Sequence, residues 1–95
     1  MADAVLLYRD KAALPDGSII EMKIWRLPAP NAERLHGLKY SLFYGREGKR
    51  IVGYDNEAGK GDHRHIRGKE ETYAFVDVET LIADFLADVR KEQEQ

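Results

Sequence analysis

The sequence has no cysteine among its 95 residues. This absence excludes disulfide bonds, thiolate nucleophiles and zinc sites built on cysteine, and it is typical of proteins from a reducing compartment. Long apolar runs are also missing, since no window approaches the roughly 20 apolar residues of a membrane helix. Met1 is followed by Ala2 and Asp3, whereas a signal peptide would begin with a basic region and an apolar run. We therefore expect a cytoplasmic protein that does not contact a membrane.

The length and the hydrophobic content limit the number of domains and the size of the core. With 95 residues, of which 43% are hydrophobic, the chain predicts one domain, residues 1–95, with a modest core between two layers. Because such a core is small, a homodimer or another partner could contribute to its stability.

The charged residues are distributed unevenly, which the net charge of −2 conceals. Residues 45–69 carry seven basic against four acidic side chains, whereas residues 70–95 carry two against eight. A basic segment beside an acidic one favours a local anion-binding surface, for which the phosphates of RNA or DNA are the obvious ligands. The alternative is that the opposite charges simply pair with each other or are solvated.

Alternation of apolar and polar residues predicts the strands. The clearest strand covers residues 19–27, where Met22 and Ile24 share one face, and residues 38–44 form another strand with an aromatic face. Residues 4–9 predict a shorter strand, separated from the second by a Pro-Asp-Gly turn. Trp25 falls on the face opposite Met22. An exposed tryptophan with neighbouring lysines is typical of contact with a partner or a nucleic acid, although a tryptophan is more often part of a core.

The second half of the chain predicts a hairpin and a helix. A glycine-containing turn at residues 46–49 joins the strand 38–44 to a strand at residues 50–54, and residues 72–76 predict a fifth short strand or an extended segment. Asp77 is placed to cap a helix whose apolar residues recur every three or four positions, and residues 91–95 are expected to fray. The prediction is an α+β fold, an antiparallel sheet of four to five strands with one C-terminal amphipathic helix on one face.

The segment from Gly53 to Arg67, GYDNEAGKGDHRHIR, contains the densest group of chemically active side chains in the chain. It holds two of the three histidines together with aspartates, arginines and glycines. Such side chains can supply metal ligands, a general acid and base or a phosphate site, and glycine allows the backbone to approach a ligand closely. The predicted hairpin places this segment at its exit.

Three segments carry a family resemblance: DGSIIEMKIW (residues 16–25), LFYGREGKRIVGYDNEAGKGDHRH (residues 42–65) and TYAFVDVETLIADFLADV (residues 72–89). Together they resemble the TumE family, small proteins regarded as the toxin component of type II toxin-antitoxin systems. The most specific element is the run from Tyr54 to His65. The resemblance implies a cognate antitoxin with a helix-turn-helix DNA-binding domain, and it implies no particular catalytic mechanism.

The preferred hypothesis is a ribonuclease that needs neither a metal nor another cofactor. One histidine would remove the proton of the ribose 2′-hydroxyl and the other would protonate the leaving oxygen, while cationic side chains would bind the phosphates. The candidate catalytic residues are His63, His65, Arg64 and Asp62. The candidate substrate-binding residues are Tyr54, which could stack on a base, and Lys60, Arg67, Arg50 and Arg46, which could bind phosphates.

Two alternatives stay open at this point. A divalent ion could be bound by Asp55, Asp62, His63 and His65, since an H-x-H pair on an extended segment directs both rings to one side. Alternatively, the protein could act without chemistry, by binding a partner, with the histidines as ordinary surface residues. His36 lies apart in a polar connection, and we expect it to be a surface residue.

Overall fold

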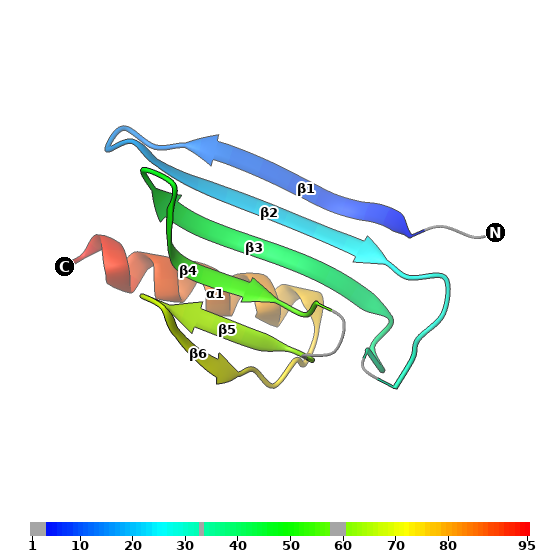
Figure 1. Cartoon of the computed structure of the whole chain (residues 1–95). Coiled ribbons are helices and arrows are strands. Elements are labelled where there is room, and N and C mark those ends of the chain that lie inside the picture. Colours follow the sequence, from blue (N-terminus) through cyan, green and yellow to red (C-terminus); the bar gives the residue numbers. More distant parts are fainter. Residues whose placement is uncertain (1–3, 33, 58–60) are drawn as a thin grey trace.

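The computed structural model describes residues 4–32, 34–57 and 61–95, which form one antiparallel sheet and one helix (Figure 1). The strands are β1 (Val5–Ala13), β2 (Ser18–Arg26), β3 (Leu38–Arg46), β4 (Lys49–Asp55), β5 (His63–Ile66) and β6 (Lys69–Thr72). They lie in the sheet in their chain order, so every neighbouring pair is antiparallel. The helix α1 (Val78–Gln93) follows the last strand and packs on one face of the sheet.

The predicted α+β architecture is confirmed, but the predicted number of strands is wrong, because the sheet has six strands rather than four to five. Alternation does not reveal β5 and β6, since both are short and rich in charged side chains. A tight turn joins them, with positive φ angles at Arg67 (49°) and Gly68 (81°). The fifth strand expected at residues 72–76 is therefore shifted, and the chain after Thr72 leaves the sheet for the helix.

The helix begins as predicted and ends later than predicted. The carboxylate of Asp77 accepts a hydrogen bond of 2.7 Å from the backbone N–H of Thr80, which is the geometry of an N-cap. Fraying was expected from residue 91, but α1 continues to Gln93. Its last turn carries Glu92, which forms an ion pair with Arg67 at the β5–β6 turn. This contact ties the end of the helix to the sheet.

The hydrophobic core lies between α1 and the face of the sheet that we call the covered face. From α1, Leu81, Phe85 and Val89 are buried there, as the helical spacing predicts. Full burial of such side chains contributes about 1.5–3 kcal/mol each. The sheet contributes Met22, Ile24, Tyr40, Leu42, Tyr44, Val52 and Tyr54. The three aromatic rings explain why so small a sheet can close a core with a single helix.

The opposite face, which we call the open face, has no helix over it in the described part of the chain (Figure 1). The first strand, β1, is exposed at all nine residues and pairs only with β2. Trp25 is half-buried on the open face, and it is not among the buried core residues. Within the described residues, no helix is both long enough and apolar enough to cross a membrane.

Candidate functional site

The hairpin of β4 and β5 places His63 and His65 side by side on the open face. In the register of these strands Asp55 pairs with His63, and Gly53 pairs with His65. Because paired residues of antiparallel strands share a face, all four positions face away from the helix. The two imidazole rings meet edge to face, with their centroids 4.9 Å apart. They are 5% and 8% exposed, so they belong to a packed surface rather than to a mobile loop.

Asp55 completes a cluster with the two histidines. One ligand atom from each of Asp55, His63 and His65 lies within 4.8 Å of the other two. Nδ1 of His63 donates to the backbone carbonyl of Gly61 at 3.0 Å, which leaves Nε2 directed at the carboxylate of Asp55. A histidine that ligates a metal through one nitrogen commonly donates the other N–H in this way.

One carboxylate oxygen of Asp55 is buried in an ion pair with His63. This oxygen, Oδ1, lies against Nε2 of His63 and makes no hydrogen bond of normal geometry within the described residues. A buried carboxylate needs partners for its charge. A cation bound by this oxygen and the two rings would add a further partner.

Arg50 borders the cluster from the same strand. Its guanidinium lies 3.9 Å from Oδ2 of Asp55, and its aliphatic part lies over Gly53, where a Cβ atom would come within 2.5 Å of Cδ. The absence of a side chain at Gly53 therefore leaves the space that the Arg50 side chain occupies. Burial lowers the pKa of His65, and the charge of Arg50 lowers it further. Both effects favour the neutral form of His65, which is the form that binds metals or accepts protons.

Glu70 lies at the rim of the cluster. It pairs with His65 across β5 and β6, and its carboxylate is 3.6 Å from Nε2 of His63. Glu70 is not among the residues predicted from the sequence, and Asp55 is predicted only as a ligand of a divalent ion. The register of β4, β5 and β6 is the signal that identifies both acidic residues. In this register Asp55 is the partner of His63, and Glu70 is the partner of His65.

Arg64 and Tyr54 lie on the covered face, so the structure does not bring them together with the two histidines. Tyr54 is fully buried, and its hydroxyl donates to the carboxylate of Asp88. Burial and this carboxylate raise the pKa of the tyrosine. Arg64 binds Glu71 and, at 3.2 Å, Asp88. Neither base stacking by Tyr54 nor catalysis by Arg64 fits these positions, and both assignments are corrected.

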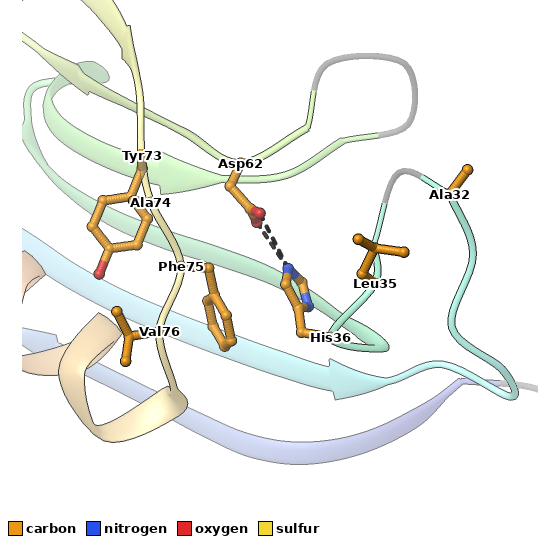
Figure 2. A pocket seen from close by; sticks show the side chains of 8 residues that line it. All are labelled: Ala32, Leu35, His36, Asp62, Tyr73, Ala74, Phe75 and Val76. Carbon is orange, nitrogen blue, oxygen red and sulfur yellow. Dashed lines mark hydrogen bonds and ion pairs between the residues drawn. The ribbon is translucent and has the colours of Figure 1, made fainter.

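Asp62 pairs with His36, a contact that Figure 2 shows. Its carboxylate accepts from Nε2 of His36 at 3.0 Å and from the hydroxyl of Tyr40 at 2.8 Å. Nδ1 of His36 accepts the backbone N–H of Leu38 at 3.1 Å, and the ring packs on Phe75 with 4.1 Å between the centroids. His36, which was expected to be a surface residue, is thus partly buried and pairs with Asp62. Asp62 anchors the connection before β3 and is not a ligand of the cluster.

This group of side chains borders a surface pocket of roughly 420 Å³. Its lining consists of Ala32, Leu35, His36, Asp62, Tyr73, Ala74, Phe75 and Val76 (Figure 2). The two ionisable groups of the pair His36 and Asp62 already satisfy each other there. The pocket thus offers an apolar rim and no available acid or base from that pair.

The remaining predicted phosphate ligands are dispersed. Arg46 forms an ion pair with Asp16 at 3.8 Å, at the far end of the β3–β4 hairpin. Arg67 is exposed and forms its ion pair with Glu92. Lys60 lies outside the described residues. Of the predicted cationic residues in the described part of the chain, Arg50 is the one that lies beside the histidines.

Comparison with known proteins identifies one family. The model of the family described as Toxin TumE matches residues 4–93, nearly the whole chain. No curated protein and no solved structure matches. The family match covers both the sheet and the helix, and it includes every residue of the cluster.

Proposed function

Because the chain belongs to the TumE toxin family, we propose that it is a toxin that cleaves RNA at its open face, with a divalent metal ion bound by Asp55, His63 and His65. The sequence alone favoured cleavage without a metal. The observation that carries the change is the convergence of Asp55, His63 and His65, whose ligand atoms lie within 4.8 Å of one another and include the buried Oδ1 of Asp55. We take the family to imply the toxin role, and the choice of RNA is part of the proposal.

The three ligands suit a first-row transition metal. Two imidazoles and one carboxylate match Zn²⁺, Mn²⁺ or Fe²⁺ better than Ca²⁺ or Mg²⁺, which prefer oxygen ligands. Three protein ligands leave coordination positions for water and substrate, as in catalytic rather than structural sites. The carbonyl of Gly61 fixes the orientation of the His63 ring, and Arg50 holds the second oxygen of Asp55.

A phosphodiester bound at this cluster would be hydrolysed. A bound divalent ion would polarise a phosphate oxygen and lower the pKa of the attacking water. Water adds to phosphorus, the bond to one bridging oxygen breaks, and that oxygen leaves with a proton. The guanidinium of Arg50, 40% exposed, is placed to bind a non-bridging phosphate oxygen and to neutralise its growing charge.

Cleavage without a metal is the second candidate. It is favoured by His65, whose ring nitrogens have no hydrogen-bond partner among the described residues and could accept the 2′-hydroxyl proton. His63 is less suited to donating a proton, because both of its nitrogens already face partners, Gly61 and Asp55. The incomplete acid–base pair is why we place this mechanism second.

The toxin family also implies an antitoxin that neutralises the protein. We propose a cytoplasmic complex with a cognate antitoxin that carries a helix-turn-helix domain, as the resemblance of the sequence implies. A homodimer stays a prediction. The open edge of β1, which pairs only with β2 and is exposed throughout, leaves a surface available for either partner.

Metal content and RNA cleavage test the proposal together. Purified protein should bind about one Zn²⁺ or Mn²⁺ per chain by elemental analysis, and EDTA should abolish RNA cleavage until the ion is restored. Asp55→Ala and His65→Ala should lose the ion, RNA cleavage and growth inhibition. The control is His36→Gln, which removes a histidine outside the cluster and should retain all three.

Each contrary result selects a different alternative. Cleavage that persists in excess EDTA, with loss only in His65→Ala, would replace the metal mechanism by acid–base catalysis. Folded Asp55→Ala and His65→Ala variants that still arrest growth would leave a protein that acts by binding alone.

A further inference from the structure

The open face carries aromatic and basic side chains beyond the cluster. Register places Leu6, Trp25 and Lys39 in one row across β1, β2 and β3, and places Phe43 beside Gly53 in the next strand. Trp25 and Phe43 are half-buried, so each ring is partly accessible to solvent. The helix covers neither of them, because it packs on the other face.

Phe43 rests on a glycine. Its ring lies over Gly45 in the same strand, where a Cβ atom would come within 2.6 Å of Cζ. Arg50 rests in the same way over Gly53. Both glycines are buried beneath the side chains that lie on them. On the neighbouring strands β3 and β4, the sheet therefore has two glycines over which a larger side chain lies along the surface, with Gly53 paired with Phe43 and Gly45 paired with Arg50.

Trp25 is paired with a cation. Nζ of Lys39 lies 5.5 Å from the centre of the indole, within the range of a cation–π contact. The two residues are direct cross-strand partners in β2 and β3. The pair therefore offers an apolar ring and a positive charge close together. A nucleotide could stack its base on the ring and bring its phosphate to the lysine.

The charges of the open face over β1 to β4 are predominantly positive. Its basic residues are Arg9, Lys11, Lys23, Lys39 and Arg50. Outside the cluster the opposing charge is Glu21, which pairs with Lys23 at 3.8 Å. The acidic residues of α1 project from the other side of the sheet. A polyanion would thus be attracted to the open face rather than to the covered face.

The aromatic residues lie at suitable distances from the cluster. Phe43, Gly53 and His65 are successive partners across three strands. With strands about 4.8 Å apart, Phe43 and His65 are separated by about 10 Å, with Arg50 between them. Trp25 lies one strand further from the cluster and two rows along, since Phe43 pairs with Glu21 and Trp25 pairs with Lys39. A nucleotide stacked on Phe43 would place a neighbouring phosphate close to Arg50.

We propose that the open face binds single-stranded RNA, with Phe43 and Trp25 stacking on bases and the basic residues binding phosphates. The inference rests on the proposed function, for which it names the substrate class. Rings in the middle of a sheet face reach a base only when that base is unpaired, so duplex RNA fits poorly. The strand would cross β2 and β3 toward Arg50 and the cluster.

The single tryptophan gives a direct test. In EDTA, so that binding is measured without cleavage, titration with a ten-nucleotide oligouridine should quench the fluorescence of Trp25 to saturation. A ten-base-pair RNA duplex should bind more weakly. Phe43→Ala should weaken oligouridine binding about tenfold, equal to about 1.4 kcal/mol. Tyr8→Ala removes an exposed aromatic ring from the covered face, near Ile24, and should leave the affinity unchanged.

Lys39→Ala should weaken binding and reduce its dependence on salt, because a phosphate contact is lost. The inference is overturned if the fluorescence of Trp25 does not respond, if duplex binds as tightly as the single strand, or if Phe43→Ala and Tyr8→Ala behave alike. Cleavage that proceeds normally in those cases would keep the proposed function and discard this surface. Binding as expected without any cleavage would instead reject the nuclease.

Discussion

The two faces of the sheet differ in how their ionisable side chains are paired. On the covered face, ionisable side chains form hydrogen bonds with one another. Tyr54 and Arg64 both donate to Asp88, and Tyr73 donates to Asp84 at 2.7 Å. On the open face, the buried Oδ1 of Asp55 meets Nε2 of His63 without a hydrogen bond of normal geometry. The covered face uses polar groups to attach the helix. The open face leaves polar groups incompletely satisfied where a ligand could complete them, which is typical of functional sites.

Strand β5 shows the contrast within four residues. His63 and His65 point to the open face, while Arg64 points to the covered face and binds Asp88 of the helix. Adjacent residues of similar polarity therefore have different roles, which the alternation of a strand decides. The dense segment of the sequence is therefore not one site. It contains the end of β4 and the whole of β5, which contribute side chains to both faces.

The largest expected effect compares two aspartates, one on each face. Asp88→Ala should cost about 3 kcal/mol of unfolding free energy, because it leaves the hydroxyl of Tyr54 and the charge of Arg64 without an acceptor. In metal-free protein, Asp55→Ala should cost less, about 1 kcal/mol, because it removes ion pairs with His63 and Arg50 that lie partly exposed to solvent. Urea denaturation in EDTA measures both. Equal losses would remove the distinction between the faces.

A smaller effect is expected when Arg50 is displaced rather than removed. In Gly53→Ala the new methyl group would occupy the space of the Arg50 side chain, which must move away. RNA cleavage should fall roughly tenfold to a hundredfold, with little change in stability. In an Arg50→Ala background, Gly53→Ala should have no further effect on the rate. A further loss of cleavage rate in that double variant would contradict the prediction, because Gly53 would then affect the rate independently of Arg50.

The smallest effect concerns the helix cap on the covered side. Asp77→Ala should lower the melting temperature by roughly 5 °C, whereas Asp77→Ser, which can still cap, should recover most of the loss. The hydrogen bond from the backbone of Thr80 lowers the pKa of Asp77. Its stabilisation is thus present above the ordinary pKa of an aspartate and is lost as the pH falls through the lowered one. The difference between the wild type and Asp77→Ala should shrink in acid.

RNA cleavage by equal amounts of folded Asp77→Ala should match the wild type, because the cap does not touch the open face. A loss of activity beyond the loss of folded protein would show that the two faces are coupled more strongly than their separate contacts indicate.

The sequence predicts the parts of the fold in which hydrophobic pattern and packing agree. The strand around Met22 and Ile24, the turn at residues 46–49 and the cap at Asp77 follow from alternation, glycine and a capping side chain. The strands β5 and β6 do not, because their pairing with β4 overrides a polar, weakly β-prone sequence. Pairing over several strands is a tertiary property, which local pattern does not contain.

The candidate site was predictable to a similar degree. The H-x-H spacing placed both rings on one side of an extended segment, and the structure has this arrangement. Which acidic residue joins them depends on register, so Asp55 and Asp62 could not be separated from sequence alone. Asp62 pairs with His36, 26 residues away. The burial of Tyr54 and Asp88 likewise depends on where the helix lies, which periodicity does not specify.

The two ion pairs between the β5–β6 hairpin and α1 also have a consequence for the synthesis of the chain on the ribosome. Arg64 binds Asp88 and Arg67 binds Glu92, so the strand that carries the histidines is held from behind by the segment that leaves the ribosome after it. A nascent chain that has synthesised His63 and His65 still lacks this support. We expect the toxin to remain harmless during most of its own translation and to become active only once the helix has docked.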